Sequence, residues 1–129
     1  MEDNKNDILK ELYKIICERK KTVDIEDKSG KDGEKSYTKY LFQEGINKIL
    51  KKVGEECSET IIAAKDASGG AGAEDYNVLV IGEVADLFYH VLVMLAALDI
   101  KFSDVEEELS ERAKKMGNLK ESITVDKNT

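Results

Sequence analysis

The stretch VLVIGEVADLFYHVLVMLAAL, residues 78–98, is the most apolar part of the chain and decides its fold. Its apolar side chains recur every three or four positions, the spacing that places residues on one face of a helix. The members of this stripe are Val80, Val84, Leu87, Phe88, Val91, Met94, Leu95 and Leu98. The pattern predicts a long helix over about residues 74–98 at the centre of the core.

The composition of the chain favours helices throughout. Charged residues make up 36% of the 129 residues and apolar residues 41%, and the chain has neither proline nor tryptophan. Without proline, long helices can run uninterrupted, and the length is enough for one modest core. We therefore expect an all-α fold, an antiparallel bundle of about four to five helices. Residues 1–117 should form a single domain, and residues 118–129 a polar C-terminal tail.

The N-terminal part of the chain predicts one helix followed by a loop. Residues 4–20 place Ile8, Leu12 and Ile16 on one stripe among charged side chains, which is typical of an amphipathic helix. Residues 22–35 are polar, charged and glycine-containing, and no apolar periodicity runs through them. This composition predicts a mobile loop within the domain.

The middle of the chain predicts a helical hairpin with the central helix. A helical pattern resumes behind Ser36 or Thr38, either of which can cap a helix, and continues to about Lys65. Gly45 is the expected break between a short helix and a long one, because glycine is unfavourable in a helix interior. Residues 66–75 are rich in glycine and should reverse the chain, so that the next helix runs antiparallel.

The last predicted helix follows residue 103. Ser103 and Glu106 have the spacing of a capping box, and Gly117 is the expected C-terminal stop. The stripe expected to face inward is Val105, Leu109, Ala113 and Met116.

Five acidic residues lie in two clusters within these helices, Glu55, Glu56 and Glu59 in the first and Glu83 and Asp86 in the second. Carboxylates three or four positions apart share a helix face. Two such charges about 4 Å apart repel by roughly 4 kcal/mol at the effective dielectric of a protein surface. If the two helices are antiparallel, the clusters can meet and form an oxygen cage. The arrangement predicts a cation between the helices.

An ordinary solvated helix face is the main alternative interpretation of the acidic clusters. It suits a single E-x-x-E pair, but Glu83 and Asp86 interrupt an apolar helix, where an unpaired carboxylate is costly. Hard divalent cations prefer oxygen ligands and bridge carboxylates to phosphates. We therefore expect Mg²⁺, or Mn²⁺ in its place, at a site that handles phosphate. His90 follows on the same stripe, where a hydrogen-bonded core histidine is commoner than a ligand.

Other chemistries fit the sequence less well. A di-iron site needs Glu-x-x-His pairs on facing helices, and this chain has one histidine. The same shortage excludes a Ser or Cys triad, and neither G-x-S-x-G nor a Walker-type phosphate loop occurs. An interaction module whose acidic clusters face solvent or bind a regulatory ion stays open on the residues alone.

Charge and hydropathy limit the partners and the compartment. A net charge of −7 argues against a nucleic-acid-binding surface. The longest apolar run, Val91–Leu98, is far below the roughly 20 residues of a membrane span, and no stretch resembles a signal peptide. Cys17 and Cys57 lie in helical sequence and are expected to be free thiols. We expect a cytoplasmic protein that binds neither nucleic acid nor membrane.

Three motifs taken together resemble a known family. The runs SYTKYLFQEG, KKVGEECSETIIAAK and EVADLFYHVLVMLAA, in that order and spacing, are similar to the phosphoribosyl-ATP pyrophosphatases of histidine biosynthesis. These belong to the all-α, MazG-like nucleotide pyrophosphohydrolases. The resemblance covers about residues 8–117. The E-x-x-E and E-x-x-D halves of the superfamily motif fall on Glu56 with Glu59 and on Glu83 with Asp86, and the additional glutamate falls on Glu55.

The resemblance implies an activity, a cofactor and an assembly. The reaction is Mg²⁺-dependent hydrolysis of N1-(5-phosphoribosyl)-ATP to N1-(5-phosphoribosyl)-AMP and pyrophosphate, by an ATP-binding cytoplasmic homodimer. Glu56, Glu59, Glu83 and Asp86 would hold the metal, and Glu55 would orient the attacking water. The candidates for substrate binding are Lys52, Lys51, Lys65 and Tyr37. The alternative activity is that of a housecleaning nucleoside triphosphate pyrophosphohydrolase of the MazG or dUTPase type.

Overall fold

The chain folds into helices in the order its sequence predicts. A computed structural model describes residues 7–25, 36–69 and 73–119. Within these ranges it consists of α1 (Ile8–Lys21), α2 (Tyr37–Glu44), α3 (Ile46–Ala67), α4 (Ala73–Ala97) and α5 (Phe102–Leu119), with no strand. The expected all-α fold is confirmed. Most of the predicted loop and of the predicted tail, residues 26–35 and 120–129, lies outside the described ranges.

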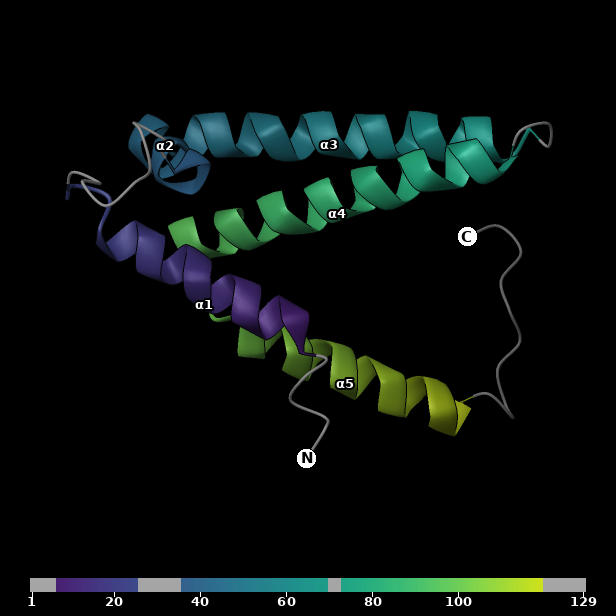
Figure 1. Cartoon of the computed structure of the whole chain (residues 1–129). Helices are drawn as coiled ribbons and strands as arrows, with labels where there is room; N and C mark the ends of the chain where they lie inside the picture. The colour runs from purple at the N-terminus through teal and green to yellow at the C-terminus, as the bar shows by residue number, and fades with distance from the viewer. Residues whose placement is uncertain (1–6, 26–35, 70–72, 120–129) are drawn as a thin grey trace.

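The long helices α3 and α4 form an antiparallel hairpin that dominates the molecule (Figure 1). The helix α1 packs against the C-terminal half of α4, and α2 lies at the same end, beside the start of α3. The acidic segments of both long helices therefore face each other near the middle of the hairpin.

The break between α2 and α3 follows the local chemistry of the sequence. The Ser36 hydroxyl accepts a hydrogen bond from the Lys39 backbone N–H at 3.2 Å, which identifies Ser36 as the cap of α2. Gly45 has φ +98°, a value that side chains with a Cβ rarely adopt. The chain can therefore end one helix and start the next at this residue, as predicted.

The core lies at one end of the hairpin, where four helices meet. Its fully buried side chains are Ile16 of α1, Leu41 of α2, Ile49 of α3 and Val93 of α4. Beyond this end the hairpin has no cover among the described residues. Ile61 is 68% exposed and Ile81 69% exposed, and Phe88, which we expected in the core, is also exposed. The apolar stripes are real, but one chain fills only part of them.

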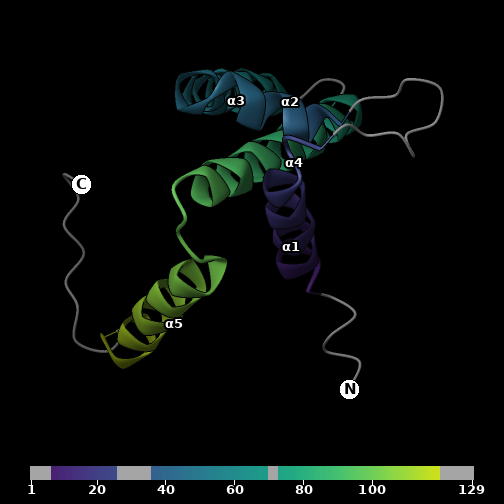
Figure 2. The same ribbon diagram turned by 90° about the vertical axis from the view of Figure 1, so that its left-hand side faces the viewer.

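The helix α5 departs from its prediction in three ways. It starts at Phe102, so Ser103 is already helical and does not cap it, and it continues through Gly117 to Leu119. The start is displaced because Phe102 packs near Tyr13 of α1, with ring centroids 6.0 Å apart. From there α5 runs away from the hairpin (Figure 2). Leu109, Ala113 and Met116, expected to face inward, are all exposed.

The helix α4 is apolar enough to raise the question of a membrane. By length and composition alone, its segment Asp75–Ala97 would be able to cross one, and 22% of its apolar window is buried. Core helices pass the same test, however, and this segment carries Glu83 and Asp86, which hydrocarbon would penalise heavily. The C-terminal part of α4, with Leu92, Val93, Leu95 and Ala96, accordingly lies in the core of the fold.

Candidate active site

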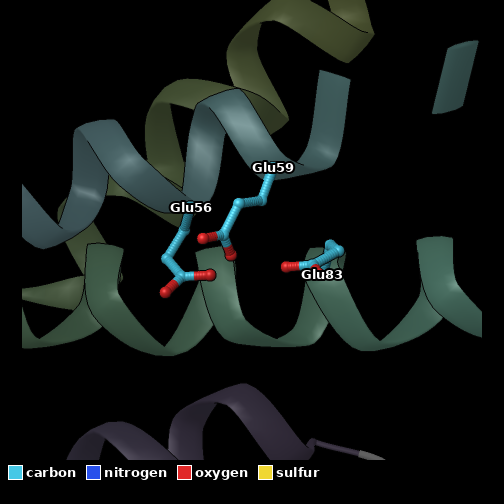
Figure 3. Close-up of side chains that lie close together, drawn as sticks. All are labelled: Glu56, Glu59 and Glu83. Carbon is cyan, nitrogen blue, oxygen red and sulfur yellow. The ribbon is translucent and has the colours of Figure 1, made fainter. Parts of the chain in front are cut away.

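Three carboxylates meet between the two long helices. Glu56 and Glu59 project from α3 and Glu83 from α4, into the space between the helices (Figure 3). One oxygen of each lies within 4.8 Å of the others. The two α3 residues are three positions apart and share a face, and the antiparallel return of α4 brings the third opposite them. The juxtaposition expected from sequence therefore occurs for these three side chains.

The cluster brings three carboxyl groups together in a partly buried space. Glu56 is only 6% exposed, and the Oε1 atoms of Glu56 and Glu83 are buried without a hydrogen-bond partner in the described part of the chain. Burial raises the pKa of the Glu56 carboxyl, and the nearby Glu59 raises it further. Burial is also the main cause that raises the pKa of the Glu83 carboxyl, and the charge of Glu59 is the next. Buried carboxylate oxygens without hydrogen-bond partners, together with raised pKa values, are typical of a carboxylate site that binds a cation.

Thr60 ties the two helices together beside this cluster. Its Oγ1 donates to the backbone carbonyl of Glu56 at 2.7 Å and lies 3.3 Å from the carbonyl of Glu83 on α4. A threonine often donates to the carbonyl four positions earlier in its helix. The contact with Glu83 forms only when α3 and α4 pack as a hairpin, so the helical periodicity of the sequence does not reveal it.

Asp86 lies outside the compact group of three. Its side chain is exposed, and its backbone carbonyl accepts a hydrogen bond from Nδ1 of His90 at 2.7 Å. Its charge still reaches the cluster, because it raises the pKa values of both Glu56 and Glu83. The structure thus puts Asp86 at the exposed rim of the cluster, where a ligand role stays a prediction.

Lys52 is the cation nearest to the acidic cluster. Its Nζ lies 3.2 Å from Glu55 and 3.7 Å from Glu56. The hydrogen bond to Glu55 raises the pKa of Lys52. Glu55, the additional glutamate, therefore faces this lysine and stands beside the group of three. The pair provides a positive and a negative group at one edge of the site.

The remaining candidate lysines are less engaged. Lys51 and Lys65 are both exposed on α3, and neither forms an ion pair within the ranges that the structure covers. Lys65 belongs to the last turn of the helix. Their positions fit surface charge as well as substrate contact.

The SYT and YH motifs meet at the end of the hairpin next to the cluster. The Tyr37 hydroxyl lies 3.0 Å from Nε2 of His90, and Thr38 is hydrogen-bonded to the hydroxyl of Tyr89. Both ring nitrogens of His90 are therefore occupied, since Nδ1 bonds Asp86, and the histidine is buried. This arrangement agrees with a hydrogen-bonded core histidine and leaves no nitrogen for a metal.

Two participants at this end were not found from sequence. Arg19 of α1 donates to the hydroxyl of Ser36 at 3.2 Å, and Tyr89 holds Thr38. Both contacts join segments far apart in the chain. The sequence offered only the SYT and YH motifs as a signal, and a motif does not identify the hydrogen-bond partner of each of its residues.

Comparison with known proteins agrees with this geometry. The family model described as "Phosphoribosyl-ATP pyrophosphohydrolase" matches residues 9–113. The phosphoribosyl-ATP pyrophosphatase of Clostridium novyi is 44% identical over 114 residues, which cover 88% of each chain. That of Clostridium acetobutylicum is 45% identical over 118 residues, 92% of each chain. That of Lactiplantibacillus plantarum is 42% identical over 113 residues, 88% of this chain and 91% of its own. The resemblance read from the three motifs is confirmed, and the chain belongs to the phosphoribosyl-ATP pyrophosphohydrolase family.

Proposed function

We propose that the chain hydrolyses N1-(5-phosphoribosyl)-ATP to N1-(5-phosphoribosyl)-AMP and pyrophosphate, a step of histidine biosynthesis, in the cytoplasm. The observation that carries this proposal is the group of Glu56, Glu59 and Glu83 in a member of this family, with two buried oxygens that have no hydrogen-bond partner among the described residues. A polyphosphate brings further negative charge to such a group. It can bind only if cations compensate the charge.

The donor set suits Mg²⁺, with Mn²⁺ as a substitute, because every side chain in the group offers carboxylate oxygen. Glu56, Glu59 and Glu83 would hold the ion, and Asp86 would complete the set from the rim. When bound, the ion neutralises charge on the triphosphate and on the departing pyrophosphate. The orphaned Oε1 atoms of Glu56 and Glu83 are the atoms that gain most from it.

The other residues act on water and on phosphate. Glu55 stands next to the cluster and is paired with Lys52, so it can orient the attacking water and accept its proton. Lys52 lies at the same edge, where its ammonium can stabilise charge on a phosphate oxygen. Lys51 and Lys65 are exposed and would serve as outer contacts for phosphate.

Product analysis tests this proposal directly. The purified protein is incubated with Mg²⁺ and phosphoribosyl-ATP, ATP or dUTP, and pyrophosphate and nucleotide products are quantified. We expect phosphoribosyl-ATP to be the preferred substrate. Preference for dUTP or another ordinary triphosphate would favour a housecleaning enzyme, and hydrolysis of none would favour an interaction module.

Two amide variants test the metal ligands. Glu59→Gln and Asp86→Asn keep the size of the side chain and remove its charge, so pyrophosphate release should be lost while the helical circular dichroism spectrum is kept. Glu107→Gln is the matched control, because Glu107 is an exposed glutamate of α5. Unchanged turnover in Glu59→Gln would refute the ligand assignment.

We also propose that the enzyme is a homodimer. Ile61 and Ile62 of α3 and Val78, Leu79 and Ile81 of α4 are all exposed, on the part of the α3–α4 hairpin beyond the core. Large apolar side chains that are exposed together are typical of association surfaces. A second hairpin on this face would complete a four-helix arrangement.

A further inference from the structure

The hydrogen bonds of His90 fix the direction of the proton on Tyr37. The backbone carbonyl of Asp86 can only accept, so Nδ1 of His90, 2.7 Å away, carries the hydrogen. In the neutral imidazole the other nitrogen, Nε2, is then an acceptor. To this neutral imidazole the Tyr37 hydroxyl, 3.0 Å from Nε2, donates its only proton.

The surroundings hold Tyr37 in this pose. Its ring lies edge-on to His90, with centroids 5.8 Å apart, and stacks with the rings of Tyr40 and of Tyr89, each with its centroid 6.1 Å away. His90 itself is 5% exposed. The ring and its acceptor are thus both fixed by packing from α2 and α4.

Tyr37 is nevertheless accessible to a ligand. It is 45% exposed, and it stands close enough to Lys52 and Glu56 for their charges to influence its pKa. Its phenol oxygen retains lone pairs but has no proton left to give. Such an oxygen can accept a hydrogen bond from a hydroxyl or amino group of a ligand. It cannot donate a hydrogen bond to a phosphate, because phosphate oxygens only accept.

We propose that His90 positions Tyr37 as a hydrogen-bond acceptor that recognises a donor group of the nucleotide, a ribose hydroxyl or a base amine, at the edge of the carboxylate cluster. This inference rests on the proposed function in that the cluster is the triphosphate site. Tyr37 selects the nucleoside part of the substrate, whereas the carboxylates and their cation hold its phosphates. His90 acts through Tyr37 as a positioning residue.

Binding measurements test the recognition without turnover. Calorimetry compares Mg²⁺–ATP with Mg²⁺–tripolyphosphate, which has the phosphates but neither hydroxyl nor amine, on the wild type and on Tyr37→Phe. We expect Tyr37→Phe to weaken ATP binding about fivefold, the effect of one lost hydrogen bond, and tripolyphosphate binding less than twofold. Tyr40→Phe is the control, because Tyr40 stacks on the same ring and should change neither.

Kinetics with His90 variants test the positioning role. His90→Leu removes the acceptor of the Tyr37 proton and should raise KM for the nucleotide about fivefold with little change in kcat. His90→Gln places an amide oxygen near the position of Nε2 and should bring KM back towards the wild-type value. The double variant Tyr37→Phe/His90→Leu should be no worse than either single one, since both remove the same contact.

Two outcomes would overturn the inference. Equal weakening of ATP and tripolyphosphate by Tyr37→Phe would show that Tyr37 serves phosphate. No weakening of either would show that the tyrosine only supports the fold, which thermal unfolding of the same variant would register. Absence of turnover on phosphoribosyl-ATP would defeat the proposed function and leave the binding comparison intact.

Discussion

The hydroxyl oxygen of Thr60 on α3 lies 3.3 Å from the backbone carbonyl oxygen of Glu83 on α4, so a hydrogen bond crosses the hairpin beside the carboxylate cluster. The same hydroxyl bonds the carbonyl of Glu56 at 2.7 Å. One side chain therefore touches the backbone of two of the three clustered glutamates. The single hydroxyl proton of Thr60 is thus shared between the backbones of α3 and α4 beside the site.

Replacement of Thr60 by valine should loosen the site. Thr60→Val keeps the shape of the side chain and removes the hydroxyl, which should lower the free energy of unfolding by about 1 kcal/mol. For a domain of this size Tm should fall by about 4 °C. Mg²⁺ affinity, measured by calorimetry, should fall with it. Thr60→Ser keeps the hydroxyl and is the control; equal losses in both variants would assign the effect to packing.

Mg²⁺ should stabilise the folded protein through the cluster. A ligand that binds only the native state at 100 times its Kd adds about 2.7 kcal/mol to the free energy of unfolding. Thermal unfolding in Mg²⁺ and in EDTA measures this difference as a shift in Tm. Glu59→Gln should remove most of the shift. A variant that keeps the full shift would place the bound ion elsewhere.

Without a cation, the cluster should make stability fall as pH rises. The folded pKa values of Glu56 and Glu83 are raised above the ordinary glutamate value. Between that value and the raised ones the folded state therefore binds more protons than the unfolded state. The contribution of these two carboxyl groups to stability is then largest below the ordinary glutamate range and is lost as pH rises through the folded pKa values. Unfolding in urea with EDTA over pH 4 to 8 measures the trend.

The same argument gives the sign of an amide substitution. Glu56→Gln removes a buried charge and should raise the free energy of unfolding of the metal-free protein at pH 7, because burial and the nearby Glu59, which raise the pKa of Glu56, make its charged form unfavourable in the folded state. Glu107→Gln on the exposed face of α5 should have no such effect. A metal-free Glu56→Gln protein less stable than the wild type would show that the carboxylate has a partner that it needs.

Local chemistry was predictable from sequence. Gly45 breaks the helix because its φ is +98°, and the Ser36 hydroxyl caps α2, both as expected from residue type. The meeting of Glu56 and Glu59 with Glu83 followed from helical spacing and one reversing turn. Such features depend on residues that are close together in the chain, and the sequence shows those residues directly.

Features that depend on distant partners were not predictable. Ser103 fits a capping box, but Phe102 packs near Tyr13 and α5 starts at Phe102, two residues earlier than predicted. The predicted stripe of α5 ends at Met116, and this side chain is exposed. Periodicity shows that a helix face is apolar, but it does not show whether another element covers that face. For the same reason the sequence did not show that Asp86 lies at the rim of the cluster.

A single charge on the open face of the hairpin should separate the subunits of the proposed dimer. Ile81 is 69% exposed on α4, and Ile81→Glu would bury a carboxylate without a partner in the interface. Light scattering coupled to size exclusion should give the mass of a dimer for the wild type and of a monomer for this variant.

Ile25→Glu is the matched control, because Ile25 is 62% exposed in the turn that follows α1, away from that face. An Ile81→Glu protein that elutes as a dimer would show that another surface joins the subunits. A wild type that is monomeric at all concentrations would leave the apolar face unexplained by self-association and end the dimer proposal.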